Sequence, residues 1–297
     1  MTLWEHIEKQ VGQATGSPFH IVGNQSVGGG DINVACRVTD GDRQYFIKSN
    51  HHRYADMFEA EAAGLKEMAA SQTVRVPEPV CSGCFDQQCF IVLEYLELGG
   101  SADMVLFGQQ LAAMHRHTKD CFGWHIDNTI GSTPQLNTLT PDASIESWIA
   151  FWRKHRLGFQ LELAANNGYG GKLQRLGERL MSDLPVLFES YQPEPSMLHG
   201  DLWGGNYGGI SDGEPVIFDP AFYYGDREAD LAMTTLFGGF GGKFYAAYNE
   251  AWPLDDGYPV RKVFYNIYHI INHLNLFGGG YHGQAMGMME SVLSEIG

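Results

Sequence analysis

The chain has 297 residues, of which 44% are hydrophobic, and its 19 basic and 35 acidic side chains give a formal net charge of −16. This composition excludes a disordered chain. The charge argues against nucleic acid or anionic lipid as a partner, because both carry negative charge themselves. An amine-bearing small molecule suits it better. At roughly 150 residues per domain, the length predicts two domains or lobes.

Cysteine usage and the N-terminal segment predict a cytoplasmic protein. Five cysteines are an odd set in a chain long enough to fold without disulfides. The opening MTLWEHIEKQV carries charges among its apolar residues, unlike the core of a signal peptide. The longest stretch without charged side chains, 263–289, contains Asn and His, so it predicts a buried amphipathic helix and no membrane span. No feature sets the oligomeric state.

The first 50 residues predict a helix followed by a hairpin. Thr2 and Glu5 form a capping box that begins the helix. Further along, residues 40–41, Asp-Gly, serve as a two-residue hairpin loop. This loop pairs Asn33 with Lys48 and so returns Lys48 to the glycine-rich turn that precedes the hairpin.

Residues 55–70 predict a helix whose apolar stripe includes Phe58 and Leu65. Glu61 lies inside that stripe. A carboxylate on a buried face needs a cation to offset its desolvation, and the nearby strand offers Lys48. We therefore expect a Lys48–Glu61 ion pair. The alternative is a Glu61 side chain that reaches past the edge of the stripe to solvent.

The pattern changes at LELGGS, a flexible joint near residue 97. Upstream, VRVPEPV and QCFIVLEYLE add two strands to the hairpin. Downstream, apolar spacing predicts helices at about 107–115, 147–165, 173–188, 230–237 and 263–277. The sequence thus predicts an α+β, bilobal fold. Residues 1–97 form a small β-rich N-terminal lobe with one main helix, and residues 98–297 form a larger, mostly helical C-terminal lobe.

The segment HGDLWGGNYGGISDGEPVIFD, residues 199–219, carries the side chains best suited to chemistry. With the Asp-Gly pair at 212–213 as a two-residue loop, Asn206 faces Asp219 across a hairpin, about 5 Å away. Two such oxygen ligands suit Mg²⁺. Asp201, on the loop that enters the hairpin, is then close to the metal and can accept a hydroxyl proton.

These residue types fit phosphoryl transfer from ATP. The reaction needs a carboxylate that orients the attacking hydroxyl, ligands that hold Mg²⁺ on the phosphates, and a Lys fixed by a Glu near the nucleotide. The glycine-rich turn adds backbone N–H groups that can approach phosphates closely, because Gly28, Gly29 and Gly30 have no side chains.

The whole pattern resembles the fructosamine kinase family of protein-kinase-like phosphotransferases, over nearly the full chain. HGDLWGGN and FDPAFYYGDREADLAM look like the catalytic and metal motifs of that family. GGGDIN, MFEAEAAGL, NTIGSTPQ and WIAFWRKHRLGFQ are similar to its more private signatures. Where some members carry Cys after the paired glycines, this chain has Asp31, so we expect no redox switch there.

The resemblance implies a role for each matching residue. Asp201 is then the catalytic base, Asn206 and Asp219 bind Mg²⁺, and Lys48 with Glu61 orients the nucleotide. The adenine-contacting hinge is Glu94, Tyr95 and Leu96, while His199 supports the catalytic loop and Asp230 tethers its backbone. Trp203 either packs in the core or forms a wall for the sugar.

The resemblance also implies a substrate, a small-molecule ketosamine or a glycated lysine, phosphorylated on a sugar hydroxyl, with O3 as the expected position. The product would release its amine, so the role would be deglycation. An aminoglycoside, choline or another amino alcohol is the alternative acceptor. A catalytically silent kinase-like binding module is a further alternative, and a metal-dependent hydrolase built on His199, Asp201 and Asp219 leaves Lys48 and Glu61 unexplained.

Two other patterns are compatible with a metal site. Cys81 and Cys84 have the spacing of a zinc knuckle, but no second pair follows. His269 and His273 are four apart on a predicted helix, without a carboxylate beside them. We expect these histidines to be core residues or to line a substrate cleft, and we do not expect them to bind metal.

Overall fold

The computed structural model describes residues 1–28 and 32–297, which form two compact units. The first contains Met1–Asp103 and Tyr207–Pro220, and the second contains Met104–Asn206 and Ala221–Gly297. The lobe boundary after residue 97 stays a prediction, and the first unit extends beyond it and also takes in residues 207–220. In the part of the chain that the structure describes, no helix is both long enough and apolar enough to cross a membrane.

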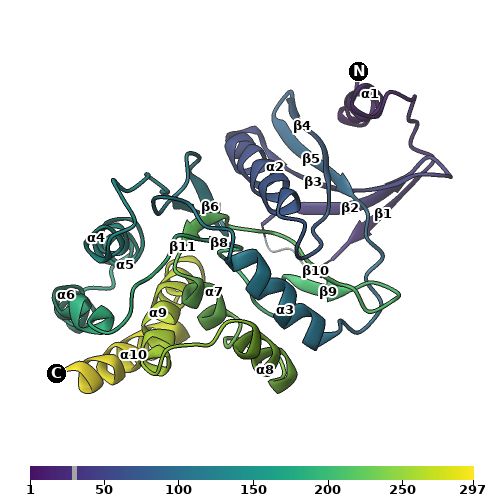
Figure 1. The fold of residues 1–297 in the computed structure, drawn as a ribbon. Helices are drawn as coiled ribbons and strands as arrows, with labels where there is room; N and C mark the ends of the chain where they lie inside the picture. The colour runs from purple at the N-terminus through teal and green to yellow at the C-terminus, as the bar shows by residue number, and fades with distance from the viewer. Residues whose placement is uncertain (29–31) are drawn as a thin grey trace. The chain divides into compact units, whose positions relative to one another are not determined.

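A five-stranded antiparallel sheet forms the centre of the first unit (Figure 1). Its strand order is β1-β2-β3-β5-β4. The strands are β1 (Gly23–Val27), β2 (Val34–Thr39), β3 (Gln44–His51), β4 (Pro79–Phe85) and β5 (Gln88–Glu94). The helices of this unit are α1 (Leu3–Thr15), the 3-10 helix His52–Tyr54 and α2 (Ala55–Ala70). Two short strands, β9 (Tyr207–Gly209) and β10 (Pro215–Ile217), pair with each other.

Both predicted helices of the first unit are present, and each packs on the sheet. The predicted capping box begins α1, which buries Ile7 and Val11 and packs on β4. Helix α2 lies against β4 and β5 and buries Phe58 and Leu65. Each fully buried apolar side chain of this size contributes about 1.5–3 kcal/mol. The stripe is therefore sufficient to hold α2, and with it Glu61, against the sheet.

The β2–β3 hairpin has a register two residues away from the predicted one. Lys48 pairs with Ala35 and not with Asn33. The connecting loop is residues 40–43, because the Asp40 carboxylate accepts hydrogen bonds from the backbone N–H groups two and three residues further on, at 3.1 and 2.7 Å. A shift by an even number preserves the face on which each side chain lies. The error therefore leaves Lys48 on the predicted side of the sheet.

The two-residue loop predicted for the β9–β10 hairpin is also wrong. The Gly213 N–H donates to the Ile210 carbonyl at 2.9 Å, and the Ile210 N–H donates to the carbonyl of Glu214 at 3.1 Å. Gly213 has φ of 84°, in the left-handed region. These contacts describe a type I turn followed by a left-handed residue, which makes a three-residue loop. Here the shift is a single residue.

The predicted opposition of Asn206 and Asp219 fails for this reason. The ladder pairs Tyr207 with Ile217 and ends there, so neither Asn206 nor Asp219 belongs to it. A one-residue shift exchanges the two faces of a strand, so the pairing that would have aligned these two side chains does not exist. Asn206 belongs to the second unit and Asp219 to the first.

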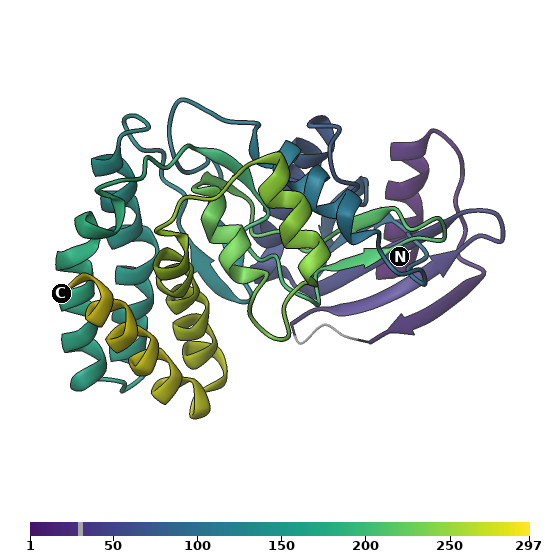
Figure 2. The ribbon, with the colours of Figure 1, turned by 60° about the horizontal axis from the view of Figure 1, so that its bottom comes forward.

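The second unit is mostly helical (Figure 2). Its helices are α3 (Met104–His115), α4 (Ile145–His155), α5 (Leu157–Asn166), α6 (Lys172–Asp183), the 3-10 helix Leu184–Phe188, α7 (Arg227–Met233), α8 (Gly242–Ala251), α9 (Tyr258–Phe277) and α10 (Gly280–Ile296). Two short hairpin-like sheets pair β6 (Asn128–Ile130) with β7 (Thr133–Gln135) and β8 (Ser196–Leu198) with β11 (Tyr223–Gly225). Helix α9 is central, because it packs against α5, α7 and α10.

The single helix predicted for residues 147–165 is interrupted at Arg156. That residue has φ −122° and ψ −92°, outside the helical region, and its side chain is fully buried. Its guanidinium donates to the Leu136 carbonyl at 2.8 Å and to the Asn137 side chain at 2.7 Å. It also lies 4.1 Å from the centre of the Tyr223 ring. These contacts hold Arg156 in the core, and it is the single residue that separates α4 from α5.

Candidate active site

Lys48 is held by two carboxylates in the first unit. It lies on β3 with only 5% of its surface exposed. Its Nζ donates to Glu61 Oε1 at 2.6 Å, so the predicted ion pair is present. The same Nζ also donates to Asp219 Oδ1, a contact that the sequence did not reveal.

The charges of this group shift the pKa values of Lys48 and Glu61. Burial alone would lower the pKa of Lys48, but the carboxylates of Asp219 and Glu61 outweigh that effect and raise it. Burial raises the pKa of Glu61, and the negative charge of Asp219 adds to this, while Lys48 acts in the opposite direction. Lys48 therefore remains a cation, fixed in place and able to present positive charge to an anion.

Asp219 is the exposed member of this group. Its side chain is 47% exposed, against 7% for Lys48 and 9% for Glu61. Its φ of 59° lies in the left-handed region, where a residue other than glycine is uncommon. Two residues earlier, the Ile217 N–H donates to the Arg75 carbonyl at 3.0 Å, which anchors β10 within the first unit. The chain thus holds a half-exposed carboxylate in a strained backbone conformation, as is frequent at functional sites.

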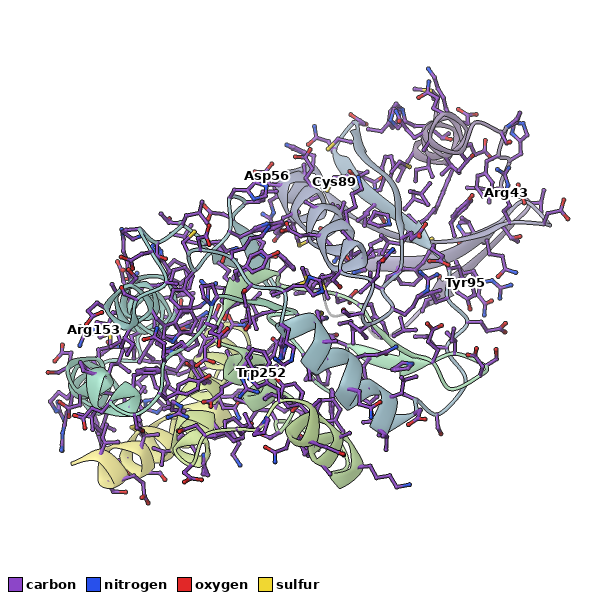
Figure 3. The ribbon with its side chains drawn as sticks, in the orientation of Figure 1. Arg43, Asp56, Cys89, Tyr95, Arg153 and Trp252 are labelled. Atoms are coloured by element: carbon purple, nitrogen blue, oxygen red, sulfur yellow. The ribbon has the colours of Figure 1, made fainter. Side chains whose placement is uncertain are left out.

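The predicted hinge, Glu94 to Leu96, is half-buried at the end of β5. Arg75 forms an ion pair with the Glu94 carboxylate, and the Glu94 N–H donates to the Glu78 carbonyl at 2.8 Å. The Arg37 guanidinium lies 4.9 Å from the ring centre of Tyr95, which is labelled in Figure 3. These contacts fix the backbone there, and its role toward adenine stays a prediction.

The predicted glycine turn is described only in part. Gly28 is exposed directly after β1, and an added Cβ would meet no atom within 4 Å. Gly29, Gly30 and Asp31 lie outside the described residues.

In the second unit, Asp230 holds the backbone of the loop that contains Asp201. Asp230, on α7, accepts hydrogen bonds from the His199 N–H at 2.7 Å and the Gly200 N–H at 2.8 Å. Gly200 has φ of 82°, and a Cβ there would lie 2.0 Å from the Ala221 carbonyl oxygen. No other residue fits without moving the loop.

Sequence reasoning missed the side chain that supports Asp230. His115, at the end of α3, is fully buried, and its Nε2 lies 3.3 Å from Asp230 Oδ2. Its Nδ1 is 2.8 Å from the Tyr248 hydroxyl. Burial lowers the pKa of His115, so the imidazole is neutral at neutral pH. The only signal in the sequence was a histidine on the apolar face of a predicted helix.

The Asp201 carboxylate has Asn206 as a neighbour. The Asn206 amide nitrogen donates to the Asp201 carbonyl at 2.8 Å and to Asp201 Oδ2 at 3.1 Å. The Asp201 N–H donates to His199 Nδ1 at 3.2 Å. Both partners of the Asn206 amide group are acceptors, which fixes its orientation and leaves its carbonyl oxygen as the atom able to bind a cation.

The donor atoms fit a hard divalent cation. The Asn206 carbonyl oxygen and the Asp219 carboxylate are the kinds of oxygen ligand that Mg²⁺ accepts, in the small number that it usually takes from protein. Among the described residues, no three or more His, Cys, Asp or Glu side chains gather into a group that could hold a metal. A metal held by these two oxygen ligands alone would complete its shell with phosphate and water.

Trp203, two residues beyond Asp201, is partly exposed. Its ring makes an edge contact with Phe237, with ring centres 5.8 Å apart. A Cβ on Gly205 would lie 2.4 Å from the Trp203 ring, so the glycine gives the indole its space.

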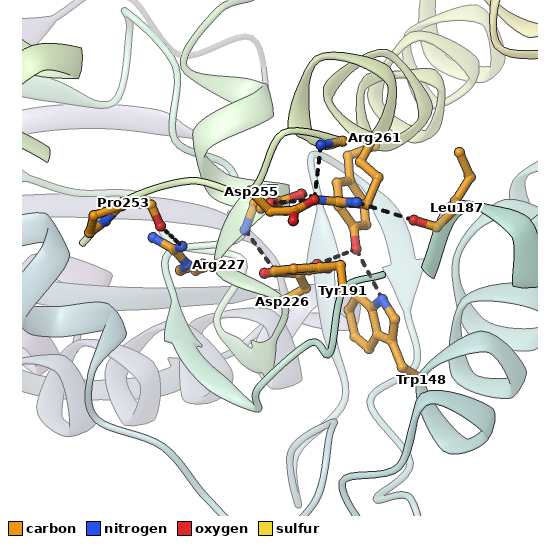
Figure 4. A network of polar contacts seen from close by, with 11 residues as sticks. Trp148, Leu187, Tyr191, Asp226, Arg227, Pro253, Asp255 and Arg261 are labelled. Carbon is orange, nitrogen blue, oxygen red and sulfur yellow. Dashed lines mark hydrogen bonds and ion pairs between the residues drawn. The ribbon is translucent and has the colours of Figure 1, made fainter. Parts of the chain in front are cut away.

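The second unit contains a second group of charged side chains (Figure 4), in which Arg261 is 2% and Glu228 0% exposed. Arg261 forms two hydrogen bonds with Glu228, at 2.7 and 3.0 Å, and one with Asp255 at 2.7 Å. Asp226 accepts hydrogen bonds from the hydroxyls of Tyr265 at 2.6 Å and Tyr191 at 2.8 Å. Asp226 also caps α7, the helix that carries Asp230.

Comparison with known proteins places the chain in a family. The model of the family described as fructosamine kinase matches residues 3–295. A probable ketoamine kinase of Synechocystis sp. is 47% identical over 293 residues, which cover 98% of this chain and 97% of that protein. A chloroplastic protein-ribulosamine 3-kinase of Oryza sativa subsp. indica is 44% identical over 283 residues, 94% of this chain and 81% of the relative.

The fold is shared as well. The crystal structure of a candidate fructosamine-3-kinase from Haemophilus somnus superposes with a TM-score of 0.88 at 27% identity, over 98% of this chain and 100% of that one. The predicted α+β, kinase-like fold is confirmed by this match. Sequence and fold agree over essentially the whole length, and the chain belongs to the fructosamine kinase family.

Proposed function

We propose that this protein is an ATP-dependent kinase that phosphorylates a sugar hydroxyl of ketosamines such as fructosamines and ribulosamines. The names of the two curated relatives, a ketoamine kinase and a protein-ribulosamine 3-kinase, support this substrate class. We assign the phosphate to O3 of the sugar, and we include glycated lysine among the acceptors. The product then releases its amine, which makes the reaction a deglycation.

The single observation that carries the proposal is the environment of Asp201. Its backbone follows two N–H groups fixed by Asp230, and its carboxylate receives the Asn206 amide group at 3.1 Å. A carboxylate held this way accepts the proton of a sugar hydroxyl as that oxygen attacks the γ-phosphorus. The bond from that phosphorus to the bridging oxygen breaks, and ADP leaves with its electron pair.

Other residues of the proposal bind the nucleotide. The Lys48 ammonium, fixed by Glu61, contacts its phosphates, and the backbone from Glu94 to Leu96 contacts adenine. The proposal assigns the backbone N–H of Gly28, the described residue of the glycine turn, to the phosphates. The proposal keeps residues 1–97 as the nucleotide-binding lobe and residues 98–297 as the catalytic and substrate lobe.

Mg²⁺ is held in this proposal by Asn206 and Asp219. When bound, it neutralises charge on the phosphates. Asn206 then has two tasks, because its amide nitrogen orients Asp201 while its carbonyl oxygen is the metal ligand.

The test is ADP release with ATP, Mg²⁺ and one acceptor at a time: a fructosamine, a ribulosamine, an aminoglycoside and choline. We expect turnover with the two ketosamines, and a phosphate ester on the sugar by mass spectrometry and ³¹P NMR. Turnover with only the aminoglycoside or choline would move the protein to another acceptor class. ATP binding without turnover on any acceptor would leave only a binding module.

The matched variant is Asp201→Asn, which keeps size and polarity. We expect kcat to fall on the order of 10²- to 10⁴-fold, the usual range for a positioned proton acceptor. The melting temperature should stay close to that of the wild type. Turnover near the wild-type rate would remove Asp201 from this role.

A further inference from the structure

Five aromatic rings of the second unit touch one another in series. Trp203 contacts Phe237 at 5.8 Å between ring centres, and Phe237 lies over His273 at 4.9 Å. His273 in turn contacts Phe277 at 5.6 Å and Tyr281 at 5.2 Å. We call this set of five residues the aromatic surface.

The aromatic surface is open to solvent at two of its members. Phe237 is 44% exposed and Phe277 is 57% exposed. Large apolar side chains do stay exposed singly, but contiguous apolar patches on a soluble protein mark places where something binds. Contact through five rings makes this surface contiguous.

Phe237 is held out by a strained backbone. Its φ of 53° lies in the left-handed region, and a bulky side chain there is an outlier. Gly238 and Gly239 follow with φ of 110° and 71°. Such strain costs on the order of 1–3 kcal/mol and persists mainly at functional sites. The strained backbone therefore indicates that the exposed position of the Phe237 ring has a function.

The histidine within the surface is uncharged. Burial lowers the pKa of His273, and its Nδ1 is 2.8 Å from the His269 carbonyl oxygen one turn earlier on α9. Burial lowers the pKa of His269 to about 3. The surface therefore presents neutral rings and does not repel a cation.

The aromatic surface begins inside the loop that contains Asp201. Trp203 follows Asp201 by two residues, and the Asn206 N–H donates to the Trp203 carbonyl at 3.0 Å. A ligand at the Trp203 end of the aromatic surface thus lies beside the loop that contains the proposed proton acceptor. In a sugar acceptor, the part that adjoins the reacting hydroxyl is the rest of the same molecule.

We infer that the aromatic surface binds the amine-bearing end of the acceptor, with the ammonium group and the carbon substituent of the amine lying on Phe237 and Phe277. This inference rests on the proposed function and extends it, because it makes these two residues determinants of acceptor specificity. Aromatic faces attract cations through the ring quadrupole, and they stack on apolar groups. The net charge of −16 favours the same cationic partner.

The experiment compares two acceptors with the same ketose. One is derived from benzylamine and the other from methylamine, so both carry the ammonium and only the first carries a large apolar substituent. Wild-type enzyme should show the lower KM for the benzyl acceptor. Phe237→Ala and Phe277→Ala should each raise that KM by roughly 3- to 10-fold, and the KM for the methyl acceptor by less, with the KM for ATP unchanged.

Leu139→Ala is the matched control. Leu139 is also an exposed apolar residue of the second unit, at 51%, and it is not part of the aromatic surface. It should leave both acceptor KM values unchanged. Because Phe277 is so exposed, its variant should fold normally even if the loop of Phe237 tolerates no change.

The outcomes separate this inference from the proposed function. If wild type phosphorylates both acceptors but the two Phe variants affect them equally or not at all, the inference is wrong and the kinase assignment stands. If no acceptor is phosphorylated, the kinase assignment fails. Calorimetric titration of the benzyl acceptor without ATP then decides the inference alone, since equal binding by wild type and Phe237→Ala overturns it.

Discussion

Two groups of buried charged residues, one in each unit, differ in the solvent exposure of their carboxylates. The Lys48 cluster consists of Lys48, Glu61 and Asp219. The hydrogen bonds described above define the Arg261 cluster as Arg261, Glu228, Asp226, Asp255, Tyr191 and Tyr265. Figure 4 labels four of them, Arg261, Asp226, Asp255 and Tyr191. In the Lys48 cluster, the Asp219 side chain is 47% exposed. In the Arg261 cluster, the carboxylate of Glu228 is 0% exposed and its own arginine only 2%.

This difference in exposure indicates that the Lys48 cluster can bind a ligand, whereas the Arg261 cluster has a structural role. Neither carboxylate of the Glu228 and Asp226 pair can reach a ligand, because each already receives hydrogen bonds from protein on its accessible oxygens. Their effect is to fix the start of α7, and through it Asp230. The Lys48 cluster keeps one carboxylate open, so it can exchange a protein contact for a ligand. Asp255, also a member of the Arg261 cluster, is 29% exposed, so partial exposure of one carboxylate does not by itself identify an active site. The larger exposed fraction of Asp219, 47%, is what distinguishes the Lys48 cluster.

Breaking the Arg261 cluster should have the largest effect on stability. Arg261→Met removes the cation but keeps the packing volume, and it leaves the buried Glu228 without the two hydrogen bonds that it accepts from Arg261. In urea titrations at pH 9, above the pKa of Glu228 of about 8, we expect the free energy of unfolding to fall by about 3–5 kcal/mol. Lys262→Met, one residue further on and partly exposed, is the control and should change little. A loss below 1 kcal/mol for Arg261→Met would mean that the cluster does not hold the fold.

Breaking the Lys48 cluster should affect activity more than stability. Lys48→Met removes a fixed positive charge near the proposed phosphates, so kcat/KM for ATP should fall on the order of 10²- to 10³-fold. Asp219 can turn to water and Glu61 can take up a proton, so we expect a smaller stability loss than for Arg261→Met. Steady-state kinetics and urea titration of the same sample give both numbers. The reverse order, a large stability loss with little change in turnover, would contradict the comparison.

The free energy of unfolding should depend on pH through Glu228, which is buried beside Asp226. Burial and the neighbouring Asp226 charge raise the pKa of Glu228 to about 8, although Arg261 acts in the opposite direction. The folded state then keeps a proton that the unfolded chain releases near pH 4.5. Stability therefore falls as pH rises between these two values, by at most about 1.4 kcal/mol per pH unit.

Glu228→Gln isolates this effect, because glutamine mimics the protonated acid and cannot titrate. As pH rises from 6 to 8, the free energy of unfolding of the wild type should fall relative to that of Glu228→Gln. Histidines with a lowered pKa, such as His269, change stability in the opposite sense below pH 6.5, but they are present in both proteins. A difference that is independent of pH would show that Glu228 is ionised throughout.

The sequence was most informative where one helix face had to be buried. The position of Glu61 in an apolar stripe predicted its partner Lys48, because desolvation leaves a buried carboxylate few alternatives. The bounds of α2, Ala55–Ala70, also follow from that stripe. Helices α8 and α10 gave no such pattern and were not predicted.

Hairpin register was the least predictable feature. Both Asp-Gly pairs suggested two-residue loops, yet the first loop has four residues and the second has three. In the first, hydrogen bonds from the Asp40 side chain decide the loop, and in the second, the left-handed Gly213 does. A register shift of two residues left Lys48 on the predicted face of the sheet, whereas a register shift of one residue removed the predicted pairing of Asn206 with Asp219. Similarly, the Lys48–Asp219 contact joins residues 171 apart, which no local pattern encodes.

The smallest expected effect comes from removing one hydrogen bond of the Arg261 cluster, and it measures how much that bond alone contributes to the free energy of unfolding. Tyr191→Phe removes the hydroxyl that donates to Asp226 at 2.8 Å but keeps the ring, which lies 4.0 Å from the Arg261 guanidinium. We expect a loss of about 1 kcal/mol in the free energy of unfolding. Tyr258→Phe is the counterpart, because its buried hydroxyl has no partner in the part of the chain that the structure describes. Removing that group should leave stability unchanged or raise it, since its desolvation is uncompensated. Equal losses in the two variants would show that the bond to Asp226 contributes nothing beyond the removal of a buried hydroxyl.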